Sequence, residues 1–398
     1  MNREDFPMMN TGYIYLDNGA TTWKSNKVLN SITEYYTSYT ANAHRGDYDL
    51  SLRVDKEYES TREVVRNFIN AKRKEEIVFT SGTTDSLNII AEGYFRHHLN
   101  KDDEIIITYS EHASNVLPWF RLQNEIGIKV VYCPLNENHE VTIDNLKKVI
   151  TNKTRVISLA HITNVIGDVR PIKEICSLAH QNNILVVVDG AQSVPHLKTD
   201  VQDLDIDFLA FSGHKMTGPT GIGVLYAKYE LLNEIKPINL GGGMNEEFDT
   251  PWSIELKPIP TRLEAGTPNI EGVIGLKAAI EYLNEIGMNN IHQHELKLRN
   301  LLVQKLKEIP HVTIYNEHSN SGIVAFNVDG VFAQDVAVYL NKHKVCVRAG
   351  NHCAKVLKNE IKVANTVRAS IYLYNTEEEI LKLVELLRNK DKVINEML

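Results

Sequence analysis

Short hydrophobic runs alternate with amphipathic stretches between about residues 77 and 226. The runs cover 77–79, 105–107, 130–132, 156–159, 184–188, 208–211 and 224–226. Continuous runs rich in β-branched residues are typical of strands that are covered on both faces. Alternation of such strands with helices is typical of a parallel sheet. The pattern therefore predicts an α/β fold with a large domain around a mostly parallel central sheet.

The flanking regions have other patterns. A short strand is expected at Ile14–Asp17, and helical periodicity predicts helices near 26–39, 52–70 and 271–286. Residues 240–270 contain glycine and proline and are weakly periodic, so they predict a linker or an irregular excursion.

After about residue 290 the organisation changes to a compact α+β pattern. Helices are expected over 292–308, 333–343 and 376–390, with strands at 312–315, 323–328, 345–347 and 367–372. A unit of about 110 residues is large enough for a separate domain. We expect a large domain at 17–288 and a small α+β domain formed by 1–16 and 289–398.

Composition narrows the functional classes. The chain of 398 residues is 43% hydrophobic, which is enough for a large core. Its net charge of −8 argues against nucleic acid as a main ligand. No signal core and no stretch of about 20 apolar residues is found, so no membrane partner is expected. Four cysteines without a C-x-x-C pair indicate neither a disulfide framework nor a metal site, and favour a reducing, cytoplasmic location.

The hydrophobic run at 208–211 leads into the polar turn Ser212-Gly213-His214-Lys215. A lysine at this point has little packing role, but a desolvated amine can form a Schiff base with a carbonyl, as in pyridoxal phosphate (PLP) enzymes. Ser212 and His214 could then bind the cofactor phosphate. For the lysine taken alone, the alternative is an exposed side chain at a strand end.

Two more polar segments follow predicted strands. Ser81–Ser86 opens a helix, where hydroxyls and backbone N–H groups can bind an anion, although an ordinary helix cap is the alternative. His112 follows the run at 105–107 and could stack on a flat ring or move protons, or be a polar loop residue.

Asp189 ends a run of five apolar residues, where a carboxylate is costly unless it meets a cation. A protonated pyridine nitrogen is such a cation, while a turn or cap role is the alternative. Gln192 could reach the oxygen of the same ring, and Asn164 follows the run at 156–159. Because ligands bind at the carboxyl ends of parallel strands, these groups are expected to converge on Lys215.

Six segments carry a resemblance over nearly the whole chain. They are Tyr15-Leu16-Asp17, Val78–Thr84, Val188–Gln192, Phe211–Lys215, Glu264–Asn269 and Val347–Ala354. In these segments the chain resembles the class V aminotransferase-like PLP enzymes of fold type I. Within that class it is similar to the SufS-type (group II) cysteine desulfurases, also called the selenocysteine lyase group.

The resemblance implies pyridoxal 5'-phosphate as cofactor and a role for each matching residue. Lys215 would hold PLP and act as acid and base, Asp189 would pair with the ring nitrogen, and His112 would stack on the ring. The remaining cofactor contacts implied are Gln192 and Asn164 at the ring, and Thr83, Thr84, Ser212, His214 and a partner subunit's Thr267 at the phosphate. The substrate contacts implied are His44, Asn164, Arg348 and Arg368.

Cys353 would be the nucleophile that takes sulfur as a persulfide, with Arg348 favouring its thiolate. The implied reaction converts L-cysteine, or L-selenocysteine, to L-alanine. Sulfur would pass to an acceptor protein, for iron–sulfur cluster or other sulfur-cofactor assembly, from a homodimeric enzyme. The alternatives are a selenocysteine lyase, another PLP-dependent lyase or aminotransferase, and a non-catalytic assembly subunit.

The chain departs from the family pattern at two positions. Asn351 stands where the first histidine of His-His-Cys is usual, and Gln334 stands where members with a zinc-containing acceptor carry a histidine. The resemblance therefore does not extend to zinc-dependent sulfur transfer.

Overall fold

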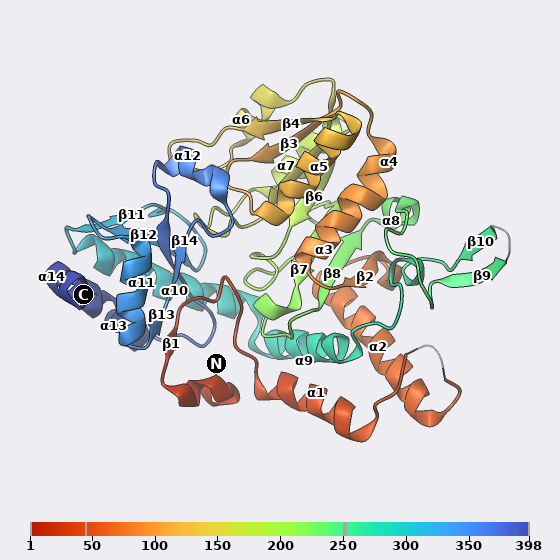
Figure 1. Cartoon of the computed structure of the whole chain (residues 1–398), viewed down its shortest axis with the longest axis horizontal. Helices are drawn as coiled ribbons and strands as arrows, with labels where there is room; N and C mark the ends of the chain where they lie inside the picture. Colours follow the sequence, from red (N-terminus) through yellow and green to blue (C-terminus); the bar gives the residue numbers. More distant parts are fainter. Residues whose placement is uncertain (1, 44–45, 250–252, 397–398) are drawn as a thin grey trace.

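A seven-stranded sheet forms the centre of the molecule (Figure 1). The computed structural model describes residues 2–43, 46–249 and 253–396. The strand order is β2-β8-β7-β6-β5-β3-β4, and only β8 runs antiparallel to its neighbours. The strands are β2 Ile77–Thr80, β3 Glu104–Thr108, β4 Lys129–Cys133, β5 Thr154–Ala160, β6 Leu185–Asp189, β7 Phe208–Ser212 and β8 Gly223–Ala227. The predicted, mostly parallel central sheet is confirmed.

Helices cover both faces of this sheet, so its strands are hydrophobic on both sides. In β3, for example, Ile106 packs into the core on one face, while Ile105 and Ile107 pack into the core on the other. The first core is closed by α2 Asp49–Phe68, α6 Ile143–Val149, α7 Ile172–Gln181 and α9 Ile270–Ile286, with α1 Asn26–Ser38 packed on α9. The second is closed by α3 Thr83–Asn88 and its π-helical continuation Ile89–Phe95, by α5 Leu117–Ile126 and by α8 Tyr229–Glu234. The short helix α4 Arg96–His98 follows the π-helical segment directly.

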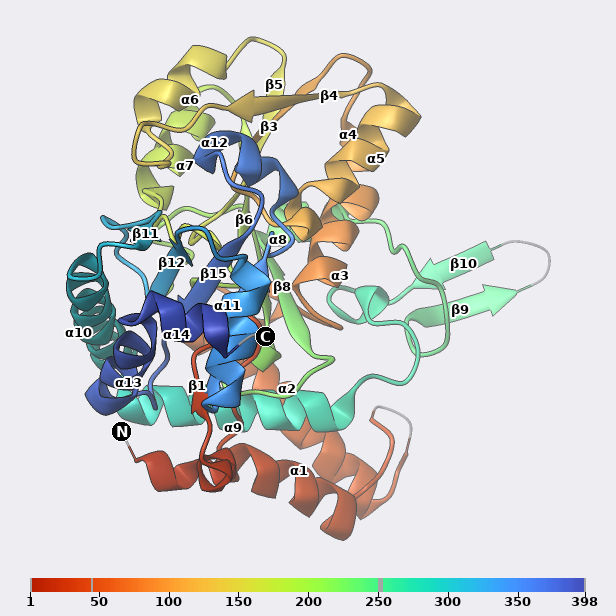
Figure 2. The ribbon, with the colours of Figure 1, turned by 60° about the vertical axis from the view of Figure 1, so that its left-hand side comes forward.

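A second, antiparallel sheet of four strands lies beside the large unit (Figure 2). Its strands, in order, are β11 Val312–Ile314, β12 Ile323–Val328, β15 Thr366–Ser370 and β14 Arg348–Gly350. Its helices are α10 Met288–Lys307, α11 Ala333–Lys342, α12 Lys358–Ile361, α13 Glu377–Leu387 and α14 Lys390–Asn395. Near the N-terminus, β1 Ile14–Tyr15 pairs in parallel with β13 Val345–Cys346.

The small unit has a hydrophobic core of its own, to which Leu16 contributes. We therefore propose the division at 288/289, with residues 1–16 in the small domain. The N-terminal residues also contact the large unit, because the ring of Phe6 lies 5.7 Å from that of Tyr282 in α9.

The sequence predicts a linker or an irregular excursion for residues 240–270, but part of this segment has regular structure. It contains an antiparallel hairpin, β9 Asn245–Asp249 and β10 Ser253–Leu256, which projects from the body in both views (Figures 1 and 2). The first three residues of β10 are exposed, so no buried face imposes the alternation by which a strand is recognised. Among the described residues, no helix combines the length and hydrophobicity needed to cross a membrane.

Candidate active site

A cavity of about 200 Å³ opens at the carboxyl ends of the central strands. The loops after β2, β3, β5, β6 and β7 all contribute to it, as expected for ligand sites of parallel sheets. The small unit adds residues from β14 and β15. The predicted site residues that line the cavity are Thr83, Thr84, His112, Asn164, Asp189, Gln192, Ser212, His214, Lys215, Arg348 and Arg368.

Two of the predicted site residues that the structure describes do not line this cavity. Thr267 and Cys353 are exposed, and neither belongs to the cavity wall. His44 lies outside the described residues.

Lys215 ends the 3₁₀ turn that follows β7, and its side chain faces the cavity. Burial lowers the pKa of its ammonium group to about 8, although the nearby charge of Asp189 opposes this shift. Asp189 is the last residue of β6, and one carboxylate oxygen accepts a hydrogen bond of 2.9 Å from Ala191 N. Burial raises the pKa of Asp189 to about 6. The amine of Lys215 can therefore lose its proton near neutral pH. The buried carboxylate of Asp189 would be stabilised by a positively charged partner.

Hydroxyl groups gather at one end of the cavity, where α3 begins. Ser212 Oγ accepts a 2.8 Å hydrogen bond from Thr83 N and lies 2.7 Å from Thr83 Oγ1. Thr84 Oγ1 lies 2.7 Å from Ser114 Oγ. Burial, followed by the charge of Lys215, lowers the pKa of His214 to about 4. These neutral donors at the start of a helix suit the phosphate of a cofactor.

His112 presents a neutral ring to the cavity. Its Nδ1 accepts a 3.2 Å hydrogen bond from Ser114 N, which assigns the ring proton to Nε2. Burial lowers the pKa of His112 to about 4, so the imidazole is uncharged at pH 7. A neutral flat ring in this place can stack on another flat ring without adding charge.

Arg368 on β15 supplies a buried positive charge. Its Nη2 donates to Asp17 Oδ1 at 2.9 Å, and its Nη1 donates to the backbone oxygen of Asn164 at 2.8 Å. The guanidinium lies against Gly19, where an added Cβ would be only 3.0 Å from Arg368 Cζ. Its Nε has no hydrogen-bond partner among the described residues. A guanidinium held in this way can bind a carboxylate.

Replacing Arg368 by lysine is expected to raise the KM for an amino-acid substrate by about 10- to 100-fold. The ammonium keeps the charge but loses the paired, planar donors, and one charge-assisted hydrogen bond contributes about 1.5–3 kcal/mol. Steady-state kinetics with L-cysteine, the substrate that the sequence resemblance implies, measure this effect. Asp17→Asn, which removes only the carboxylate behind the arginine, should raise KM less. An unchanged KM in Arg368→Lys would contradict this role.

The loop that carries Cys353 is bonded to the large unit on both sides of the thiol. Asn164 Nδ2 donates to the carbonyl of His352 at 2.7 Å, and Ala113 N donates to the carbonyl of Cys353 at 2.8 Å. His352 and Cys353 both have left-handed backbone conformations, with φ of 52° and 59°. Such conformations cost about 1–3 kcal/mol each and tend to occur at functional sites. The loop therefore holds an exposed thiol next to His352, which lines the cavity.

The cavity fits PLP by an observation that is independent of motifs. Gln192 Nε2 donates to the carbonyl of Gly19 at 2.8 Å, but the buried Gln192 Oε1 finds no hydrogen-bond partner within residues 2–43, 46–249 and 253–396. Asn164 Oδ1 and Arg368 Nε are also buried without a hydrogen-bond partner in the part of the chain that the structure describes. Buried polar groups are normally hydrogen-bonded, so these atoms indicate a polar ligand.

Sequence reasoning missed several residues of this site. Gly19 lies in the turn Asn18-Gly19-Ala20 that follows the first predicted strand, and a glycine in such a turn is the one local signal that could have pointed to it. Ser114 lines the cavity two residues after His112. His352 precedes Cys353 and is buried, with its Nε2 2.9 Å from Thr366 Oγ1. No local pattern distinguishes it from a surface histidine.

The fold and the cavity define a fold type I PLP-dependent enzyme. The aminotransferase class-V family model matches residues 14–383, and the chain belongs to this family. It is 43% identical over 370 residues to a probable cysteine desulfurase of Halalkalibacterium halodurans, covering 92% of this chain and 90% of the relative. It is 41% identical over 395 residues to a probable cysteine desulfurase of Staphylococcus epidermidis, covering 97% and 95%.

Solved structures agree with these relatives. A cysteine desulfurase of Escherichia coli, in an S-sulfonic acid form, superposes with a TM-score of 0.93 at 37% identity and covers 100% of this chain and 98% of that one. The apo cysteine desulfurase of Thermococcus onnurineus gives a TM-score of 0.93 at 38% identity, covering 97% and 96%. The predicted family and fold class are confirmed.

Proposed function

We propose that the protein is a PLP-dependent cysteine desulfurase, which converts L-cysteine to L-alanine and carries the sulfur on Cys353 as a persulfide. One observation carries this proposal: the cavity unites Lys215, Asp189 and Arg368, while the adjacent loop presents an exposed thiol. The similarity to cysteine desulfurases over nearly the whole chain supports it.

The residues of the cavity would hold PLP in a defined orientation. Lys215 Nζ would bind its carbonyl carbon, Asp189 its ring nitrogen, and Gln192 its ring hydroxyl. Thr83, Thr84, Ser212 and His214 would bind its phosphate, and His112 would stack on its ring. When bound, PLP supplies an electron sink for negative charge at the substrate α-carbon.

The chain's own groups would then handle the substrate. Arg368, with Asn164 and Arg348 nearby, would bind the carboxylate and fix the α-carbon beside Lys215. The amine of Lys215, once the substrate amine had displaced it from the cofactor, would take the α-proton, which its lowered pKa of about 8 favours near neutral pH. The Cys353 thiolate would attack the substrate sulfur, so that a sulfur–sulfur bond forms as the carbon–sulfur bond breaks. Protons returned to the carbon skeleton would complete alanine.

The persulfide would pass its outer sulfur to an acceptor protein, for iron–sulfur cluster or other sulfur-cofactor assembly in the cytoplasm. Gln334 in α11 argues against transfer through a zinc ligand of that acceptor. Selenocysteine lysis and transamination remain alternatives on the same fold. The exposed thiol argues against a cysteine-conjugate lyase and against an aminotransferase, because neither of these needs a thiol there.

One assay tests this proposal. Purified protein is incubated with L-cysteine, with and without a thiol reductant, and alanine and sulfide are measured. We expect equal amounts of alanine and sulfide. We also expect the reductant to increase the rate of turnover. Pyruvate and ammonia would instead identify a lyase, and a requirement for a keto acid would identify an aminotransferase.

We also propose a homodimer in which Thr267 reaches the partner subunit's cofactor phosphate. Thr267 is exposed and lies outside the cavity of its own chain, and the hairpin before it projects from the body (Figure 2). Light scattering is expected to give twice the chain mass of 45.1 kDa.

Thr267→Ala should keep the dimer and weaken PLP binding by about tenfold or more, the effect of one hydrogen bond to a charged group. Cofactor release, followed by visible absorbance, measures the change. Thr313→Ala, at an exposed threonine of β11, is the control and should bind PLP normally. A fully active monomer would contradict this arrangement.

A further inference from the structure

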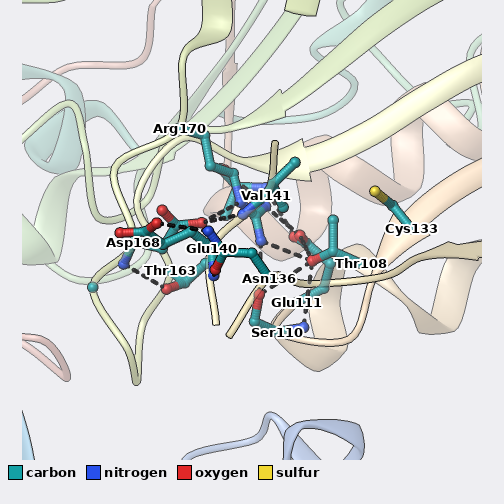
Figure 3. A network of polar contacts seen from close by, with 12 residues as sticks. Thr108, Ser110, Glu111, Cys133, Asn136, Glu140, Val141, Thr163, Asp168 and Arg170 are labelled. Carbon is teal, nitrogen blue, oxygen red and sulfur yellow. Dashed lines mark hydrogen bonds and ion pairs between the residues drawn. The ribbon is translucent and has the colours of Figure 1, made fainter. Parts of the chain in front are cut away.

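A buried polar network surrounds Arg170 (Figure 3). The side chain of Arg170 is completely buried, and each of its five N–H donors meets an acceptor. The acceptors are the Glu111 carboxylate, the Ala160 carbonyl at 2.9 Å, Thr108 Oγ1 at 2.7 Å, Ser110 Oγ at 2.8 Å and Asp168 Oδ2 at 3.3 Å. One side chain therefore joins the ends of β3 and β5 to the loop that follows β5.

Glu111 completes the connection between these strand ends. While one of its oxygens binds Arg170, the other accepts from Ala160 N at 2.8 Å and from Asn115 Nδ2 at 2.9 Å. Ala160 is thus bonded at its N–H by Glu111 and at its C=O by Arg170. It lines the cavity and pairs in register with Asp189 on β6. The network therefore fixes the strand pair that carries Asp189.

The same network controls two more groups of the site. Glu111 directly precedes His112, so the carboxylate bonds set the position of that ring. Asp168 closes the loop that contains Asn164, since Asp168 N donates to Thr163 Oγ1 at 3.0 Å and Asp168 O accepts from Thr163 N at 3.2 Å. Arg170 itself is not part of the cavity wall.

We propose that Arg170 is a positioning residue for the desulfurase reaction, which sets the geometry of His112, Asn164 and Asp189 without touching cofactor or substrate. This inference rests on the proposed function. A contribution to stability does not explain the network well. The solvation free energy lost when an ion pair is buried is about as large as the free energy gained from the attraction between the two charges. The planar guanidinium has a specific use here, since a lysine offers only three donors from a single atom.

The test uses the PLP-loaded enzyme with Arg170→Lys, which keeps the charge and loses the planar donors. The kcat for cysteine should fall by about 10- to 100-fold, because small displacements of reacting groups have effects of this size. KM should change less, because Arg368 still binds the substrate carboxylate. Visible circular dichroism of the bound cofactor should change as well, since it reports how the ring is held. Glu111→Gln should alter the same signal.

Matched variants separate positioning from stability. Arg299→Lys changes another buried arginine, which bonds the carbonyls of Asn316 and Glu317 in the small unit, and should leave kcat and dichroism unchanged. Ser110→Ala removes a single acceptor of Arg170 and should lower kcat and change the dichroism in the same way, but less. This variant provides the test if Arg170→Lys does not fold.

Parent-like dichroism and kcat in Arg170→Lys or, if that variant does not fold, in Ser110→Ala would overturn the inference, whatever happens to Tm. Equal losses in Arg299→Lys would also overturn it. Failure of the proposed function would appear in the unaltered enzyme as an absence of alanine and sulfide, whereas failure of this inference appears only in the variants.

Discussion

Lys215→Ala is expected to give a folded protein that binds PLP only reversibly and forms no measurable alanine from cysteine. The variant removes both the amine that would hold the cofactor and the base that would take the α-proton. Loss of a general base alone lowers a rate by about 10²–10⁴-fold. The low pKa of about 8 for this amine depends on burial in the cavity, so another lysine on the surface could not replace it.

Borohydride reduction of the unaltered enzyme, followed by peptide mass spectrometry, tests the site of attachment. The cofactor should be found on the peptide that contains Lys215. Lys24 is the strongest alternative attachment site, because burial also lowers its pKa to about 8 and its Nζ donates to the carbonyl of His214. Label on Lys24 would contradict the assignment. Lys228→Ala, at a lysine paired with Asp205 and Asp207, should keep normal activity.

Cys353→Ala is expected to keep its cofactor, lose nearly all sulfur release, and retain appreciable selenocysteine lysis. Breaking the carbon–sulfur bond needs a nucleophile that carries the sulfur away, whereas the weaker carbon–selenium bond breaks with less help. Loss of a nucleophile or base contribution is about 10²–10⁴-fold or more. Parallel assays of sulfide from cysteine and selenide from selenocysteine measure the difference.

The same thiol should react fastest with an alkylating agent. Cys353 is exposed, while burial raises the pKa of Cys133 to about 11 and that of Cys176 to about 12. Cys346→Ala, at a cysteine of strand β13, is the matched control, and this variant should release sulfur at the normal rate. A Cys353→Ala protein that makes sulfide from cysteine at the parent rate would exclude the persulfide mechanism and leave only a general PLP-dependent lyase.

The sequence by itself determined the central sheet and the position of Lys215 in the turn that follows one of its strands. Strands such as β6 and β7 are apolar on both faces, so their runs are visible without any tertiary information. Because parallel strands end at one edge, the polar residues that follow them had to converge. This reasoning placed Asp189 and His112 near the lysine from their order along the chain alone.

Only the tertiary structure decided how the small unit completes the site. Arg368 is bonded to Asp17 and Asn164, and Asn164 also bonds the loop of Cys353 from 188 residues away. In the sequence, Arg170 likewise has no feature that distinguishes it from an ordinary loop arginine. Its role becomes visible only when the structure shows its five acceptors together. The physical reason is that such bonds join segments far apart in the chain, and local hydrophobic periodicity carries no information about which distant groups meet.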